Sequence, residues 1–201
     1  MTRLKYHGVS LCFYRFNSFT TAKMIIFEDI LSGDELLSDT FKIQTTEDGM
    51  FYQTDCRKYL KKTNEDFELE GANPSAEDGG DEDGDGSEVM VHDIEDQFRL
   101  VWLKTEEGLK PSKEAFKSHL KVYAKKLLAK LQESGNKEAV DQFKAGAGAA
   151  VKKILANYDN YDILMGQSMD GDAMHVLIDF REDGVTPFAT LWKHGLKENK
   201  V

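Results

Sequence analysis

A long acidic, glycine-rich segment divides this chain into two parts. Residues 64–96 contain fourteen Asp and Glu residues and neither Lys nor Arg. The centre of the segment, from Glu70 to Gly86, has repeated glycines and almost no apolar side chain. Because like charges repel and glycine favours the unfolded ensemble, such a segment buries little and stays solvated. We therefore expect an acidic flexible loop at about residues 64–88, and a folded body formed by the sequence on either side of it.

Outside residues 1–23 and the acidic segment, the charge of the chain is balanced. The net charge is -10, and residues 64–96 alone contribute -14. Residues 1–23 contribute +4, and the remaining sequence has 22 bases and 22 acids. A nucleic-acid-binding protein needs a net basic face, so specific nucleic-acid binding is not expected. A membrane partner is not expected either, because no apolar run approaches the roughly 20 residues that cross a bilayer.

The first 23 residues differ from the sequence that follows. They contain basic and hydroxyl side chains and no acid. One interpretation is a mitochondrial presequence; the interpretation we favour is an upstream extension, with Met24 as the true start. We expect residues 24–201 to form one domain, since about 200 residues bury a single core. The only cysteines, Cys12 and Cys56, are too few for a disulfide framework or a zinc cage, and a reducing, cytosolic setting fits them.

The apolar pattern predicts strands, then two helices, then strands. Strand-like runs occur at residues 24–31, 41–43, 50–52, 89–94 and 98–103. From residue 112 to about 157 the apolar spacing becomes three and four residues, which predicts a helical hairpin with Ser112 as its N-cap and a break at Gly135. We expect Gly146 and Gly148 to allow close approach of the two helices.

The strand pattern then returns at residues 163–165, 174–180 and 188–192, with a turn at residues 182–184. This order predicts an α+β fold, in which a mostly antiparallel sheet body carries a protruding helical hairpin.

One stretch of the acidic segment has half of a calcium-binding loop. Asp81, Asp83 and Asp85 occupy the first, third and fifth positions, and a glycine follows at the sixth. The twelfth position, where a bidentate glutamate is needed, is His92. A weak calcium site is therefore one interpretation, and diffuse attraction of cations by an acidic tract is the other.

Lysines recur along the first predicted helix. They are Lys113, Lys117, Lys121 and Lys125, with Lys126 and Lys130 beyond them. A solvated helix face is one interpretation. The other is an electrostatic docking face for an acidic partner, which is either an acidic protein surface, such as the acidic tails of tubulin, or a nucleic acid. The same lysines could also bind the acidic loop of this chain.

No pattern of a catalytic site is recognisable. His7, His92, His119, His175 and His194 lie in no known nucleophile or metal motif. Phosphate-binding glycine loops and the common hydrolase motifs are missing too. We therefore expect a protein that is not an enzyme.

Three motifs in order resemble the translationally controlled tumour protein family. The stretch Gly71–Glu77 resembles the first signature of that family, and Met24–Asp39 resembles its amino terminus. Residues 161–166 and 179–188 are similar to its second signature and last hairpin, and Trp192–Leu196 is similar to fungal members. The resemblance covers residues 24–201.

The resemblance implies a β-tent related to the Mss4-type chaperones of small GTPases. It also implies a cytoplasmic, cytoskeleton-associated binding protein whose partners are microtubules, a translation elongation factor and a small GTPase, with weak calcium binding and no required cofactor. Because the chain lacks a Cys-x-x-Cys pair, we expect no zinc. Glu35 matches the family acid linked to GTPase contact, with Asp39 nearby, whereas the second such acid is here Gln167.

The resemblance therefore predicts roles in microtubule stabilisation and protein synthesis. The alternative is a regulator of a small GTPase that acts by nucleotide exchange. A calcium buffer is a third interpretation.

Overall fold

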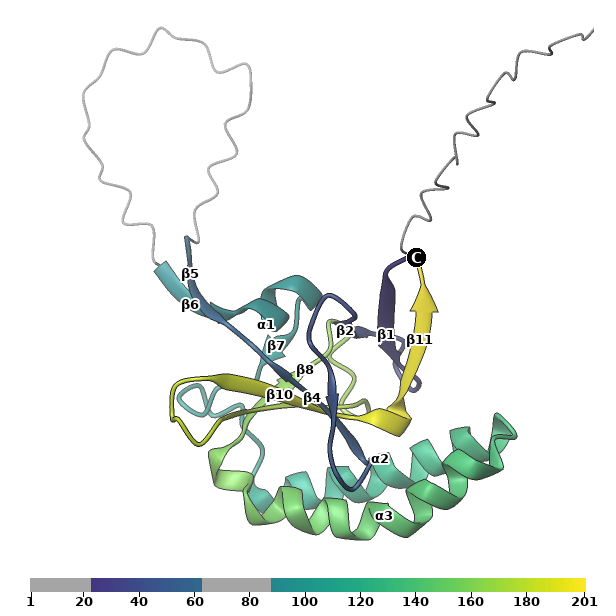
Figure 1. Cartoon of the computed structure of the whole chain (residues 1–201). Coiled ribbons are helices and arrows are strands. Elements are labelled where there is room, and N and C mark those ends of the chain that lie inside the picture. The colour runs from purple at the N-terminus through teal and green to yellow at the C-terminus, as the bar shows by residue number, and fades with distance from the viewer. Residues whose placement is uncertain (1–22, 63–87) are drawn as a thin grey trace, which may run out of the picture.

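The structure, a computed structural model, describes residues 23–62 and 88–201 and combines three antiparallel sheets with a helical hairpin (Figure 1). The α+β class is confirmed. Residues 1–22 of the predicted extension and residues 64–87 of the predicted acidic loop lie outside the described residues.

The largest sheet has six strands. Their order is β3 (Gln44–Thr45), β4 (Phe51–Asp55), β10 (Pro187–Trp192), β9 (Val176–Phe180), β8 (Asp162–Met165) and β7 (Val101–Trp102). The predicted β9–β10 hairpin is present, and Gly184 adopts a φ of 67° in its turn. Val176, Leu177 and Ile178 are all buried. Since successive strand residues point to opposite faces, both faces of the sheet are covered here.

A three-stranded sheet joins the two ends of the described body. Its order is β11 (Leu196–Lys200), β1 (Ile25–Asp29) and β2 (Glu35–Ser38). Ile25 is paired with Lys200, and the amide of Val201 donates to the Met24 carbonyl at 2.9 Å. The sequence pattern did not predict β11, because its residues after Leu196 are polar and exposed.

Two short strands form a separate ribbon above the main sheet in Figure 1, namely β5 (Lys58–Lys62) and β6 (Glu88–His92). The helix α1 (Asp93–Phe98) follows β6 directly. Two 3-10 turns complete the fold, η1 (Tyr158–Asn160) and η2 (Lys193–Gly195).

The predicted strands at residues 89–94 and 98–103 are partly wrong, because α1 lies between them. The amide of His92 donates to the Glu95 carboxylate at 3.3 Å, and this bond stabilises the first turn of a helix. One helical turn then places Ile94 and Phe98 on the same buried side. Arg99 ends the helix at a φ of 52°, and only Val101–Trp102 remain a strand.

The predicted helical hairpin is confirmed as α2 (Lys113–Glu133) and α3 (Lys137–Ala156). The Ser112 hydroxyl accepts from the amide of Ala115 at 3.2 Å, which makes it the expected N-cap. Gly135 adopts a φ of 74° in the connection, and Asn136 caps α3. In Figure 1 the pair lies along one side of the strands, and its connection extends past them.

Aromatic packing joins the hairpin to the sheet. Trp192 on β10 lies 4.7 Å from the Phe51 ring and 5.9 Å from the Phe143 ring of α3. α2 buries Phe116, Leu120, Tyr123, Leu127 and Leu131 against the same core.

The two glycines of α3 have different surroundings, which corrects the expected role of both. A methyl group at Gly146 would overlap the Met50 side chain, so the close approach is to the sheet body and not to α2. A methyl group at Gly148 would meet no atom within 4 Å. Gly148 therefore faces open space.

Candidate functional site

The described surface has two places where the predicted partner-binding residues gather. One is the outer side of the helical hairpin, and the other is a polar hollow beside β2. The calcium candidates Asp81, Asp83 and Asp85 lie outside the described residues, so that site stays a prediction.

The six predicted lysines of α2 are all exposed, but they occupy two different flanks of the helix. Lys117 and Lys126 are nine residues apart, which at 100° per residue places them about 180° apart around the axis. Lys126 forms an ion pair of 2.5 Å with Asp172, and Lys130 one of 3.0 Å with Glu133. Lys126 and Lys130 therefore belong to a second flank, whose charge is partly neutralised.

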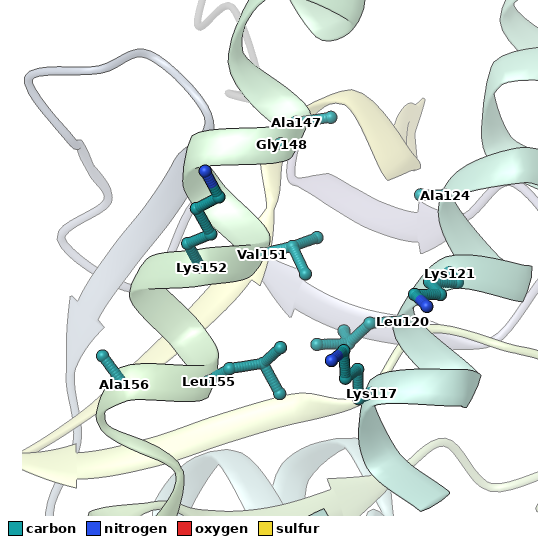
Figure 2. A pocket seen from close by; sticks show the side chains of 10 residues that line it. All are labelled: Lys117, Leu120, Lys121, Ala124, Ala147, Gly148, Val151, Lys152, Leu155 and Ala156. Atoms are coloured by element: carbon teal, nitrogen blue, oxygen red, sulfur yellow. The ribbon is translucent and has the colours of Figure 1, made fainter. Parts of the chain in front are cut away.

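Lys117 and Lys121 lie on the rim of a groove between α2 and α3 (Figure 2). We call it the hairpin groove; its volume is about 640 Å³. Lys152 from α3 lines the opposite side. The rest of its lining is apolar or small: Leu120, Ala124, Ala147, Gly148, Val151, Leu155 and Ala156.

Small side chains explain why the hairpin groove is open. Ala124 on α2 and Ala147 and Gly148 on α3 fill little of the space between the helices. In Figure 2, Leu120, Val151 and Leu155 point into this space from the two sides. Sequence reasoning missed the groove and Lys152, although the facing small residues were the available signal.

The positive charges of the lysines at the hairpin groove have no acidic partner within the described part of the chain. Lys117, Lys121 and Lys152 form no ion pair with any residue of 23–62 or 88–201. Three ammonium groups therefore surround an apolar floor. Lys113 and Lys125 are exposed on the same helix but do not line the groove.

The polar hollow brings together two residues that are far apart in the sequence. Glu35, at the start of β2, and Gln167, after β8, line the same space of about 450 Å³. Asp34, Gln97 and Arg99 line it as well. Asp39 does not: it follows the other end of β2, about 13 Å further along at the usual rise of a strand.

Asp34 holds the two sides of this hollow together. Its carboxylate accepts from the Ser168 amide at 3.1 Å and from the Ser168 hydroxyl at 2.6 Å. A methyl group at Gly166 would overlap that carboxylate, so the position next to Gln167 requires glycine. The Asp34–Ser168 contact thus fixes Gln167 near Glu35.

A stacked pair of histidines joins α2, which carries His119, to His175 just before β9. The rings of His119 and His175 are 3.9 Å apart, and the Phe116 ring stacks on His175 at 5.9 Å. Burial and, as a smaller effect, the neighbouring His119 lower the pKa of His175 to about 3. Burial lowers the pKa of His119 as well, so both rings are neutral near pH 7. Neutral rings packed among aromatic side chains support the core.

Cys56 is a free, buried cysteine. Burial, together with the nearby charge of Asp93, raises the pKa of its thiol to about 12. The thiol therefore stays protonated and is a poor nucleophile at neutral pH.

Within residues 23–62 and 88–201, no three His, Cys, Asp or Glu side chains are grouped in a way that could bind a metal ion. In the same part of the chain, none of the helices has the length and apolar character needed to span a bilayer.

Comparison with known proteins gives one consistent result. Residues 24–197 match the family model described as translationally controlled tumour protein. A translationally-controlled tumor protein homolog from Aspergillus fumigatus is 77% identical over 180 residues, which are 89% of this chain and 100% of that protein. A homolog from Emericella nidulans is 73% identical with the same coverage.

The solved structures agree with this result. A translationally controlled tumor-associated protein from Schizosaccharomyces pombe matches with a TM-score of 0.69 at 40% identity, over 88% of this chain and 99% of that one. A Caenorhabditis elegans structure with a similar name matches with a TM-score of 0.60 at 29% identity, over 88% of this chain and 98% of that one.

Proposed function

Because this chain belongs to the translationally controlled tumour protein family, we propose that it is a non-enzymatic binding protein of the cytoplasm and cytoskeleton. In this proposal it stabilises microtubules and supports protein synthesis through a translation elongation factor. It also binds calcium weakly through Asp81, Asp83 and Asp85.

The observation that supports microtubule binding is the set of exposed lysines on α2. Lys113, Lys117, Lys121 and Lys125 are solvent-exposed and form no ion pair within the described residues. Uncompensated ammonium groups attract an acidic surface, and the attraction weakens as salt screens it. The acidic tails of tubulin have the matching charge.

Reversing the charge of one flank of α2 tests this proposal. We expect the triple variant Lys117→Glu, Lys121→Glu, Lys125→Glu to bind microtubules about tenfold more weakly or worse in co-sedimentation, since each exposed ion pair contributes up to ~1 kcal/mol. The matched control is Lys126→Glu with Lys130→Glu, on the flank where both lysines already have acidic partners. Unchanged co-sedimentation of the triple variant would contradict the proposal.

A second candidate function is regulation of a small GTPase by nucleotide exchange. The polar hollow supports it, because Glu35 and Gln167 occupy it together with Arg99. Exposed carboxylate and guanidinium groups in one hollow fit a polar protein partner better than an apolar one. Because Gln167 is uncharged, the hollow has one carboxylate fewer than the resemblance to the family implies.

Nucleotide release separates this candidate from the first. If the hollow promotes exchange, the wild-type protein accelerates release of a fluorescent guanine nucleotide from a small GTPase, and Glu35→Gln loses most of that acceleration. Glu198→Gln, an exposed glutamate of β11 that does not line the hollow, is the matched control and keeps it. A release rate that the wild-type protein does not change would reject the exchange function and leave microtubule binding unaffected.

A further inference from the structure

We propose that the hairpin groove is a docking site for an acidic amphipathic helix of a partner protein. The inference goes beyond microtubule binding, which requires only the charge of α2. The hairpin groove offers both apolar contact and charge, and the two requirements together define a narrower class of ligand.

The apolar part of the groove supplies the contact area. Val151 and Leu155 are only half-buried, although they point between the two helices together with the buried Leu120. Apolar side chains in an open groove favour a ligand that covers them, because burial of apolar area stabilises a complex by about 25 cal/mol per Å². A polyacidic tail without apolar side chains would leave this floor uncovered.

The positive charge beside the apolar lining of the groove favours a negatively charged ligand. Lys117 and Lys121 lie on the α2 side and Lys152 on the α3 side, so a ligand in the groove has ammonium groups on both flanks. None of the three has an acidic partner within the described residues. A helix with an apolar stripe and glutamates beside that stripe would pair with both flanks while its apolar face covers the floor.

The length of the groove sets the length of the ligand. The lining residues extend from Lys117 to Ala124 on α2 and from Ala147 to Ala156 on α3. At 1.5 Å per residue these stretches are about 11 and 14 Å long. Two to three turns of helix cover that distance, with anchors at positions i, i+3, i+4 and i+7.

Gly148 permits a test that leaves the fold intact. Gly148 lines the groove, and a side chain at this position enters open space, because its Cβ would meet no atom within 4 Å. Leucine is also a better helix former than glycine in the interior of α3. Gly148→Leu therefore fills the groove without removing a lysine, and its melting temperature should equal or exceed that of the wild-type protein.

The probe is a fluorescein-labelled peptide of about 14 residues, with leucines at i, i+3, i+4 and i+7, glutamates beside them and alanine elsewhere. Fluorescence anisotropy of the full-length protein should show saturable binding. Gly148→Leu and the double variant Lys121→Glu, Lys152→Glu should each weaken it at least about tenfold, a change that corresponds to ~1.4 kcal/mol. The double variant Lys113→Glu, Lys125→Glu, with the same change of charge as Lys121→Glu, Lys152→Glu but outside the groove lining, should alter it less than about twofold, as expected for screened surface charges.

Three outcomes would overturn the inference. The first is that Gly148→Leu binds the peptide as well as the wild-type protein. The second is equal binding of a peptide with serine in place of leucine, or with lysine in place of glutamate. The third is displacement of the peptide by a single-stranded RNA at lower concentration than by unlabelled peptide. Because Gly148→Leu keeps all lysines, unchanged microtubule co-sedimentation of this variant distinguishes a failure of this inference from a failure of the microtubule proposal.

Discussion

Replacing Phe116 by alanine is expected to lower the free energy of unfolding by about 3–5 kcal/mol, the usual cost of removing a fully buried aromatic side chain. Phe116 is 0% exposed. Its ring lies 5.4 Å from the Tyr158 ring and 5.9 Å from the His175 ring. Tyr158 in turn donates its hydroxyl to the Pro111 carbonyl, just before α2. The cavity would therefore loosen the place where both ends of the hairpin meet the sheet.

Urea denaturation followed by circular dichroism measures this loss. Val122→Ala is the matched control, because Val122 is an apolar residue on the same helix but 44% exposed. That change should remain within about 0.5 kcal/mol, as for most surface substitutions. A loss below about 1 kcal/mol in Phe116→Ala would mean that the hairpin is not anchored through this ring.

Acidification is expected to destabilise the protein through His175. The folded protein holds the pKa of His175 at about 3, against an ordinary value of 6.5. Folding thus favours the neutral ring, so its contribution is fully present above pH 6.5 and is lost as the pH falls from 6.5 towards 3. At pH 5 the loss amounts to about 2 kcal/mol for this one group. Burial raises the pKa of Asp29, which acts in the opposite direction at the lower end of this range.

His175→Phe isolates the histidine from the other titrating groups. Both ring nitrogens of His175 lack a hydrogen-bond partner among the described protein atoms, so phenylalanine leaves no partner unpaired. It also keeps an aromatic ring against His119 and Phe116. Urea midpoints at pH 7, 6 and 5 should fall less steeply in the variant than in the wild-type protein. Parallel slopes would show that His175 does not carry the acid sensitivity.

Local sequence signals predicted the parts of the fold that local interactions determine. Ser112 as an N-cap, the break at Gly135 and the hairpin turn at Gly184 depend on neighbouring residues, and all three occur in the structure. β11 was missed because a polar strand exists only through its pairing with β1. The helix α1 was missed although Glu95, three residues after His92, was a signal for its first turn.

The candidate site was less predictable, since it depends on how distant segments pack. The spacing of the lysines was enough to predict two flanks. Lys126 is nine positions after Lys117, which is two and a half helical turns and places the two on opposite sides of the helix. The hairpin groove was hidden for a different reason. Gly146 and Gly148 are equivalent by sequence, and only the position of Met50 shows that one is enclosed and the other open.

The pairing of β1 with β11 also affects how this protein is best handled. Since Met24 and Val201 are hydrogen-bonded neighbours, a tag or fluorophore at the carboxyl end sits beside the point where residue 24 enters the body. Figure 1 shows this corner on the opposite side of the molecule from α2 and α3. Immobilisation through Val201 would therefore present the lysine-bearing helices to solvent, which makes the carboxyl end the preferred attachment point for surface-based measurements.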